Sequence, residues 1–342
     1  MSVDRRQLLG GLAVGAAGSL AGCASAVPQS ATVRRPDTDD LLVDPDREPD
    51  EIIPLWPDGV PGVGEEAHQN QLVERAGPGE MPNRAYFDIA EPHLAVFRAS
   101  QPDGSALMIM PGGGYARVVI DKEGYEGARW FSRRGMTVFV LFYRLPGQNG
   151  GAGWAAGADA PLQDAQRAMR IIRHRSSDFG IAPDRIAALG FSAGGHLSGS
   201  LATRFDIPVY EPVDAADAQS ARPDLSGLAY PVVTMAGPHV HGGSRDNLLG
   251  PSPSPEAIET YSVEQAIRPD TPPLFVFHSS DDASVPVENA LALYEGARRE
   301  GVPVDLHVFP TGGHGYGFRI SQKQTAAGWP GLFDQWRRRA FV

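Results

Sequence analysis

A serine framed by glycines is the first feature of this sequence that could carry out chemistry. In Gly190-Phe191-Ser192-Ala193-Gly194, a glycine lies two residues before the serine and another two residues after it. This pattern favours a sharp turn from a strand into a helix, which holds the hydroxyl exposed at the tip of the turn. A serine hydroxyl becomes a nucleophile when a histidine takes its proton and a carboxylate orients that histidine. The motif therefore indicates acyl transfer, provided that both partners follow.

Both partners follow in the later part of the chain. Asp282 comes after the apolar run from Leu274 to His278, and His314 comes after the run from Asp305 to Phe309. These positions lie at the carboxyl ends of expected strands, where open α/β sheets gather their sites. The order serine, aspartate, histidine is that of α/β-hydrolases and differs from trypsin-like and subtilisin-like enzymes. We predict Ser192 as the nucleophile, His314 as the general base and Asp282 as the residue that orients the histidine.

Three consecutive glycines end an early apolar run, in Met110-Pro111-Gly112-Gly113-Gly114-Tyr115. Glycines let the backbone come close to a substrate. Backbone N–H groups there could bind the oxyanion of a tetrahedral intermediate, and each such donor is worth about 3 to 4 kcal/mol. We expect the donors to be Gly113, Gly114 and the amide of Ala193.

Short apolar runs alternate with helical patterns along most of the chain. The expected strands are Ala95–Phe97, Ala106–Met110, Thr137–Phe142, Arg185–Leu189, Gly227–Thr234, Pro273–His278 and Val304–Phe309. Apolar spacing predicts helices around Leu162–Ile172 and Ala290–Ala297. Alternating strands and helices indicate an α/β fold with a mainly parallel sheet covered by helices on both faces. The segments Ile207–Arg222 and Pro251–Pro255 are expected to be loops or part of a lid.

The composition excludes several classes of function. A net charge of −11 opposes binding to nucleic acid or to an anionic membrane face, so neither is an expected partner. One cysteine forms no intramolecular disulfide and no cysteine zinc site. His239 and His241 have the spacing of metal ligands on a strand, but no third ligand follows at a diagnostic distance. We therefore expect neither a metal nor a cofactor.

The N-terminus has the composition of an export signal. Arg5 and Arg6 precede an apolar run that is too short to span a bilayer, and they resemble a twin-arginine motif. Leu20-Ala21-Gly22-Cys23 resembles the lipobox of bacterial lipoproteins, in which Cys23 is lipidated; the alternative is a cleaved signal with an incidental cysteine. We expect an export signal over 1–22, a flexible tether over 23–50 and the catalytic domain over 51–342. The protein would then be periplasmic or attached to the outer membrane, and it would touch a membrane only through its N-terminal lipid.

From about Ile52 to Val342, the chain resembles bacterial α/β-hydrolases of the carbohydrate-esterase type, which include acetyl xylan esterases and feruloyl esterases. The shared motifs are Leu55-Trp56-Pro57, Pro111–Tyr115, Glu123-Gly124, Tyr143-Arg144-Leu145, Pro161–Ala165, Gly190–Leu197, Arg222-Pro223-Asp224, Gly243–Gly250 and Gly312–Gly315. The resemblance implies that the carboxylate of the pattern Asp-x-x-Val-Pro, Asp282 rather than Asp281, is the catalytic one. It also implies removal of short acyl groups, such as acetyl, from decorated plant polysaccharide or oligosaccharide through an acyl-enzyme.

Other activities remain open on the residues alone. A general short-chain esterase and a feruloyl esterase fit the same motifs. A serine peptidase of this fold usually carries a propeller or a larger lid, and a glycan-binding lipoprotein without turnover would lack one of the catalytic elements. The sequence indicates neither a propeller nor a larger lid, and no catalytic element is missing from it.

Five polar or aromatic residues near these motifs are candidates for contact with an acylated carbohydrate or another small ester. They are Tyr115, Glu123, Ser244, Arg245 and Asn247. Packing in the core or at the rim is the alternative for Tyr115 and Glu123, and a solvated loop is the alternative for the other three. The run Asp121-Lys122-Glu123 is typical of a solvated turn, and His196 is expected to pack within a helix.

Overall fold

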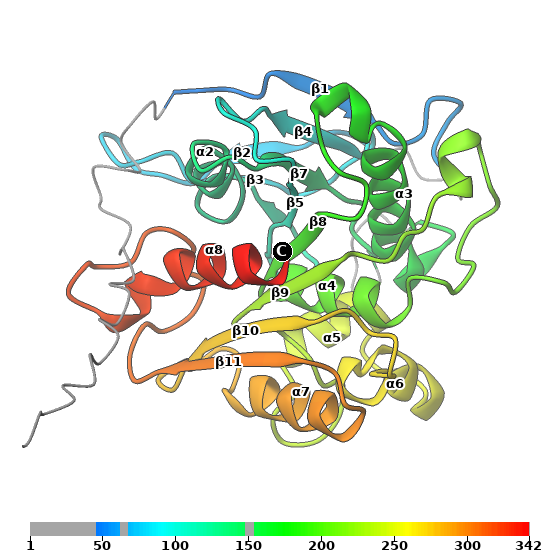
Figure 1. Cartoon of the computed structure of the whole chain (residues 1–342). Helices are drawn as coiled ribbons and strands as arrows, with labels where there is room; N and C mark the ends of the chain where they lie inside the picture. Colours follow the sequence, from blue (N-terminus) through cyan, green and yellow to red (C-terminus); the bar gives the residue numbers. More distant parts are fainter. Residues whose placement is uncertain (1–45, 62–67, 148–153, 342) are drawn as a thin grey trace, which may run out of the picture. The chain divides into compact units, whose positions relative to one another are not determined.

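The computed structural model describes residues 46–61, 68–147 and 154–341 (Figure 1). The expected export signal, Cys23 and most of the expected tether lie outside these residues. Contacts with the domain begin before residue 51, because the guanidinium of Arg47 donates to the Asp50 carboxylate and to the Arg98 carbonyl. Within the described part of the chain, no helix is both long enough and apolar enough to span a bilayer.

A central sheet of eight strands carries the fold, in the order β1-β4-β7-β5-β8-β9-β10-β11. Its strands are β1 (Glu51–Pro54), β4 (His93–Phe97), β5 (Ala106–Met110), β7 (Thr137–Phe142), β8 (Ile186–Phe191), β9 (Leu225–Ala229), β10 (Leu274–Ser279) and β11 (Val304–Phe309). β1 pairs with β4, and β4 with β7, in antiparallel fashion, whereas every pair from β7 to β11 is parallel. The expected, mainly parallel sheet is therefore confirmed.

Helices cover both faces of this sheet (Figure 1). They are α2 (Glu126–Ser132), α3 (Ala160–His174), α4 (Ala193–Thr203), α5 (Gly242–Leu249), α6 (Pro255–Tyr261), α7 (Glu288–Arg299) and α8 (Trp329–Ala340). Adjacent residues of a strand point to opposite faces. In β9, Phe333 of α8 packs over Gly227, and Gly199 of α4 packs over the next residue, Leu228. α8 and α4 therefore lie on opposite faces of the sheet.

A second, small sheet lies outside the central one and was not predicted. It consists of β2 (Leu72–Glu74), β3 (Arg84–Tyr86) and β6 (Val118–Val119), paired antiparallel in the order β2-β3-β6. Strands of two or three residues carry no readable alternation of apolar and polar side chains. This sheet matters for the site, because its register aligns the end of β2 with the end of β6, and Arg75, which follows β2, lines the cavity.

The strand predicted over 227–234 is wrong at its carboxyl end. β9 stops at Ala229, and Tyr230 has a φ of +34°, which breaks the strand. Pro231 follows and has no N–H to donate to a neighbouring strand. Pro255 also begins the helix α6, at the end of a segment expected to be a loop.

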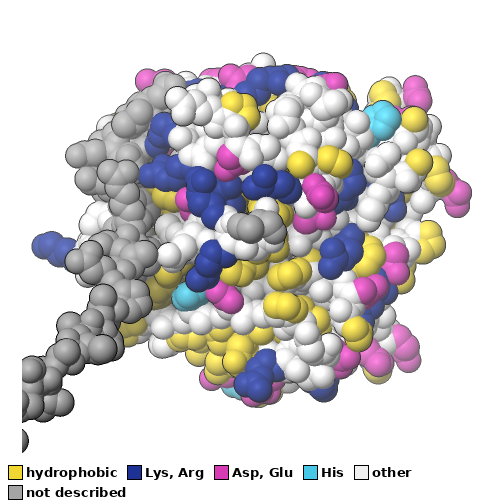
Figure 2. All heavy atoms as spheres, in the orientation of Figure 1, with side chains coloured by type: hydrophobic (Ala, Val, Ile, Leu, Met, Phe, Trp, Pro, Cys, Tyr) yellow, Lys and Arg dark blue, Asp and Glu magenta, His cyan; other side chains and the backbone are white. Residues whose placement is uncertain are grey.

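The charge of the surface is locally uneven. Figure 2 shows several Lys and Arg side chains around the place where α8 ends. Three arginines of α8 pair with carboxylates: the buried Arg337 with Asp103 at 2.6 Å, Arg338 with Asp334 at 3.0 Å and Arg339 with Asp305 at 3.5 Å. Each of these three arginines of α8 therefore has a carboxylate partner.

Candidate active site

Ser192 lies at the junction between β8 and α4, in a strained backbone conformation. Its φ is +55° and its ψ is −117°, a region that non-glycine residues rarely adopt. The two flanking glycines are needed because the chain folds back on itself here. A Cβ at Gly190 would overlap the carbonyl of Gly194, and a Cβ at Gly194 would overlap the carbonyl of Met110. The glycine spacing read from the sequence thus corresponds to a steric requirement.

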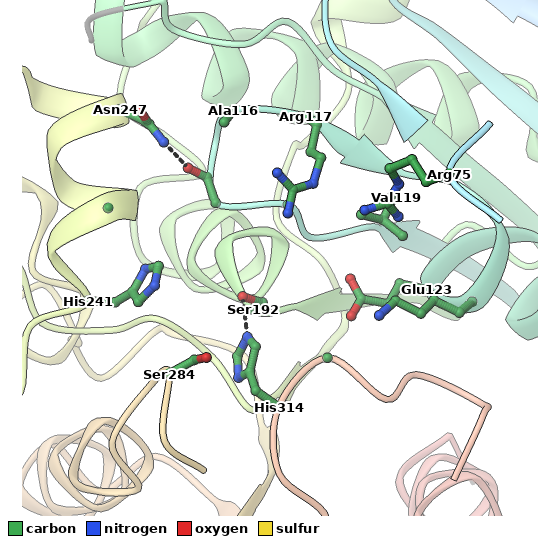
Figure 3. A pocket seen from close by; sticks show the side chains of 15 residues that line it. Arg75, Ala116, Arg117, Val119, Glu123, Ser192, His241, Asn247, Ser284 and His314 are labelled. Atoms are coloured by element: carbon green, nitrogen blue, oxygen red, sulfur yellow. Dashed lines mark hydrogen bonds between the residues drawn. The ribbon is translucent and has the colours of Figure 1, made fainter. Parts of the chain in front are cut away.

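The structure brings together the three residues predicted for catalysis. The Nε2 atom of His314 lies 2.8 Å from the Oγ atom of Ser192, as drawn in Figure 3. The Nδ1 atom of the same imidazole lies 2.6 Å from the Oδ2 atom of Asp282. A carboxylate only accepts, so Nδ1 carries the proton and Nε2 presents its lone pair to the serine hydroxyl. This arrangement prepares the hydroxyl to lose its proton to His314.

Asp282 is held ionised by its surroundings. Its Oδ1 atom accepts the backbone N–H groups of Ser284 and Val285, each at 2.9 Å. The Nε2 atom of the buried His278 lies 3.2 Å from Oδ2 and 2.9 Å from the Val285 carbonyl, so that nitrogen carries a proton and donates. Burial alone would raise the pKa of Asp282, but hydrogen bonds from the two histidines and from a backbone amide outweigh it and hold the pKa well below its ordinary range.

The glycine loop after β5 lies beside Ser192 with donors that are free to bind an oxyanion. Gly113 and Gly114 line the cavity above the serine, and Ala193 begins α4. Among the described residues, no acceptor takes a hydrogen bond from the N–H of Gly113, Gly114 or Ala193. Gly113 has a φ of +140°, and a Cβ there would overlap the carbonyl of Arg117. The predicted oxyanion donors are therefore close to the nucleophile.

Three side chains fix the shape of this glycine loop. The Tyr143 hydroxyl donates to the Pro111 carbonyl at 2.7 Å. The Glu123 carboxylate accepts the Gly112 N–H at 3.0 Å, and the Asn247 amide donates to the Gly114 carbonyl at 2.8 Å. Asn247 and Glu123 also line the cavity, so these two of the five candidate contacts can reach a ligand.

Glu123 belongs to a buried network instead of a solvated turn. Residues Asp121–Tyr125 form a π-helix in which Asp121 and Glu123 are buried, contrary to our expectation. Tyr230, which the sequence did not single out, donates its hydroxyl to Glu123 at 2.9 Å and accepts the Gly317 N–H at 2.9 Å. Burial and the Glu123 charge raise the pKa of Tyr230 well above its ordinary value, so the hydroxyl stays protonated. This network ties the glycine loop to the loop that carries His314.

We expect the substitution Tyr230→Phe to weaken both stability and catalysis. The Glu123 carboxylate and the Gly317 N–H would each lose a buried partner, which costs about 1 to 3 kcal/mol per group. Because the Tyr230 hydroxyl holds Gly317, three residues after His314, its loss should loosen the loop that positions the imidazole, and kcat should fall about tenfold. Urea unfolding and steady-state kinetics measure the two effects. Tyr294→Phe, on the outer helix α7, is the matched control, and equal losses in both variants would contradict the role of Tyr230.

Tyr115 is buried and is not among the residues that line the cavity, contrary to one of our expectations. Its side chain is buried, with 2% exposed, and its hydroxyl lies 2.7 Å from the Nδ1 atom of His196. The Nε2 atom of His196 lies 2.7 Å from the Tyr261 carbonyl and therefore carries the proton. Nδ1 accepts from Tyr115, so the pair holds α4 against the loop before β6. His196 is thus a packed helix residue, as expected.

Because His196 is buried, we predict that the protein loses stability as the pH falls. Burial lowers the pKa of His196 from 6.5 to about 4, so the unfolded chain takes up the proton first as the pH falls. This contribution to stability is complete above pH 6.5 and is lost progressively down to about pH 4, by about 2 kcal/mol between pH 7 and pH 5. Urea unfolding at several pH values checks this. The pH slope should be shallower in His196→Gln, and an unchanged slope would contradict the assignment.

Two further candidates for substrate contact are also corrected. Ser244 is fully buried, and its hydroxyl and N–H both meet the Nδ1 atom of His241, at 2.8 and 3.1 Å. Arg245 pairs with its neighbour Asp246 at 2.8 Å and does not line the cavity. His241 caps the start of α5 by accepting the Ser244 N–H, so Ser244 is engaged in the first turn of the helix, which its position in a glycine-flanked segment did not reveal.

Several residues line the cavity that we did not predict as substrate contacts. The cavity has a volume of about 330 Å³ and is also lined by Arg75, Ala116, Arg117, Val119, Lys122, His241, Gly243, Ser284 and Gly315. Arg117 and Lys122 follow the glycine motif by a few residues, which was a usable signal. Arg75 had none, because it reaches the cavity only through the small sheet.

His239 and His241 are the pair whose spacing raised the question of a metal site. His239 lies 3.7 Å from Glu288, whereas His241 turns to Ser244. In the ranges that the structure describes, no three His, Cys, Asp or Glu side chains converge in a way that could hold a metal ion.

Comparison with known proteins gives the chain a family. The model of the BD-FAE family matches residues 98–296. Endo-1,4-β-xylanase B of Butyrivibrio fibrisolvens is 36% identical over 225 residues, which cover 66% of this chain and 34% of that protein. The acetylxylan esterase of Xylanibacter ruminicola is 33% identical over 235 residues, covering 68% of this chain and 45% of that one. The chain thus spans less than half the length of these curated relatives.

A solved structure extends the likeness over nearly the whole domain. The acetyl ester-xyloside bifunctional hydrolase of Caldicellulosiruptor lactoaceticus is 34% identical, with a TM-score of 0.68, and the match covers 85% of this chain and 97% of that one. The sheet order, the turn at Ser192 and this likeness together show the α/β-hydrolase fold. The chain therefore belongs to the BD-FAE family of α/β-hydrolases.

Proposed function

We propose that this protein is a serine carboxylic-ester hydrolase that removes short acyl groups, acetyl above all, from decorated oligosaccharides or polysaccharides. The observation that carries the proposal is the imidazole of His314, placed 2.8 Å from the Ser192 hydroxyl and 2.6 Å from the Asp282 carboxylate. That geometry suits a nucleophilic serine with its base and the orienting carboxylate of that base.

The reaction follows from the positions of these groups. The Ser192 Oγ atom attacks the ester carbonyl carbon as His314 takes the hydroxyl proton at Nε2. The N–H groups of the glycine loop and of Ala193 bind the oxyanion that forms. His314 then returns the proton to the leaving alcohol, and an acyl group remains on Ser192. A water molecule, activated by the same imidazole, releases the acid and restores the serine.

The choice of acetyl on a sugar rests on the cavity and on the relatives. Among the described residues, no Phe, Tyr or Trp lines the cavity, so an aromatic acyl group such as feruloyl would find no stacking surface. Polar and charged side chains and glycine backbone suit sugar hydroxyls. Two relatives are named an acetylxylan esterase and an acetyl ester-xyloside bifunctional hydrolase, and both names support an acetyl ester as the substrate.

The test is acid release by the purified protein from three esters: acetylated xylo-oligosaccharides, 4-nitrophenyl acetate and methyl ferulate. We expect rapid acetate release from the first two and little ferulate from the third. Cleavage of the aryl acetate alone would keep the ester hydrolase and discard the sugar substrate. Failure on all three esters would overturn the proposed function. The Ser192→Ala variant, purified in parallel, controls for contaminating esterases.

A further inference from the structure

The cavity above Ser192 has two chemically different sides (Figure 3). Asn247, His241 and Ser284 lie on one side and are neutral or weakly basic. Arg75 lies on the other side, Arg117 lies above the serine, and Lys122 also lines the cavity. We call Arg75, Arg117 and Lys122 the cation cluster. It stands out because the chain as a whole has a net charge of −11.

Within the described part of the chain, the charges of Arg117 and Lys122 are not neutralised by ion pairs. Arg117 stacks over the Phe87 ring at 5.8 Å, and its Cγ atom packs close to Gly113 in the glycine loop. Its Nε atom is buried and has no hydrogen-bond partner among the described residues. Over the same ranges, neither Arg117 nor Lys122 forms an ion pair with a carboxylate. Most other interior arginines of this protein are paired, as Arg144 is with Asp164.

Arg75 is held in place to face the same space. Its Nε and Nη2 atoms donate to the carbonyl and the side-chain oxygen of Asn83, at 3.0 and 2.6 Å. Arg75 and Arg117 line the same cavity. Burial and the positive charge of Arg117 lower the pKa of Arg75, although the charges of Glu123, Glu74 and Asp121 act in the opposite direction. Like charges gathered in this way cost free energy unless an anion binds between them.

The one carboxylate in the cavity is already engaged. Glu123 accepts the Gly112 N–H at one oxygen and the Tyr230 hydroxyl at the other. Its single negative charge can offset one of the three positive charges of the cation cluster. Three cationic side chains and one engaged carboxylate leave an excess of positive charge next to the predicted nucleophile.

We propose that the cation cluster binds a carboxylate carried by the sugar, so that the preferred substrate is an acylated oligosaccharide with a uronate residue next to the acylated sugar. This inference rests on the proposed function for the ester and extends it to the charge of the alcohol moiety. Arginine offers paired N–H donors that match a carboxylate, and lysine adds a mobile point charge. Because the cluster lies on one side of Ser192 and binds the sugar part of the ester, the opposite side is left for the acyl group.

A binding experiment tests the cluster without relying on turnover. The Ser192→Ala variant is titrated by calorimetry with a xylo-oligosaccharide that carries one glucuronic acid branch and with the unbranched oligosaccharide of equal length. We expect the branched sugar to bind at least fivefold more tightly, and the difference to shrink in 0.5 M NaCl. Adding Arg117→Gln or Lys122→Gln should reduce the preference to about twofold or less. Adding Arg298→Gln, which removes an exposed charge on α7 away from the cavity, should leave it unchanged.

Kinetics with the wild-type protein separate the two proposals. The ratio of kcat/KM for the acetylated branched sugar over the acetylated unbranched sugar should exceed about five. Arg117→Gln should lower this ratio, whereas Arg298→Gln should leave both the ratio and the hydrolysis of neutral 4-nitrophenyl acetate unchanged. Equal binding of the two sugars, or binding of neither, would overturn the cation cluster even if esters are cleaved. Absence of acetate release from every ester would overturn the proposed function, whatever the binding data show.

Discussion

Replacing Ser192 with alanine is expected to lower kcat for ester hydrolysis by about 10⁵- to 10⁶-fold. The hydroxyl is the only group within hydrogen-bond distance of the His314 Nε2 atom among the described residues. Without it no acyl-enzyme forms, and hydrolysis would rely on water and on the remaining oxyanion donors. Acetate release measures the loss, and intact-protein mass spectrometry after rapid quenching should show an added acetyl group on the wild type alone.

A matched serine elsewhere shows whether the effect belongs to this position. Ser177 lies exposed in the turn before β8, at the amino end of that strand, whereas Ser192 follows its carboxyl end. Ser177→Ala should keep full activity. Ser192→Ala protein that is folded and retains more than about 1% of the activity would rule out Ser192 as the nucleophile.

Replacing Asp282 with asparagine is expected to lower kcat by about 10³- to 10⁴-fold. The Oδ1 atom accepts two backbone N–H groups, so the asparagine oxygen should keep that position and turn its NH₂ group towards His314. That NH₂ group would donate to Nδ1 and move the imidazole proton to Nε2. The imidazole could then no longer accept the proton of Ser192, although its position would hardly change. Steady-state kinetics over pH 5 to 9 checks the loss.

The neighbouring aspartate provides the control for this substitution. Asp281 is exposed, and its Oδ1 atom accepts the N–H groups of Gly312 and Gly313 at 2.9 and 2.8 Å. An asparagine oxygen can accept the same two donors, so Asp281→Asn should lower kcat less than about threefold. A larger loss for Asp281→Asn than for Asp282→Asn would exchange the roles of the two residues.

The residues predicted for catalysis could be found in the sequence because their constraints are local. Gly190 and Gly194 are needed within a few residues of Ser192, since any side chain there would overlap backbone. Asp282 and His314 each follow a strand of six residues, and β5, β7 and β8 are buried along their whole length. A run of apolar residues and the turn that ends it are visible without knowledge of any distant partner.

What surrounds the catalytic residues was decided by contacts between distant parts of the chain. Tyr230 and Glu123 are 107 residues apart, and nothing near either one in the sequence indicates that they form a hydrogen bond. A tyrosine such as Tyr115 suits a binding surface, yet the hydrogen bond between its hydroxyl and His196 places its side chain in the core.

The sequence by itself determined the α/β class, the order of the catalytic residues and the glycine loop, because each depends on neighbours within one strand or turn. The tertiary structure alone decided which side chains face the cavity. Arg75 reaches it because β3 pairs with β2 on one side and with β6 on the other. Such pairings depend on register and burial summed over the whole fold, and two- or three-residue strands carry too little pattern to reveal them.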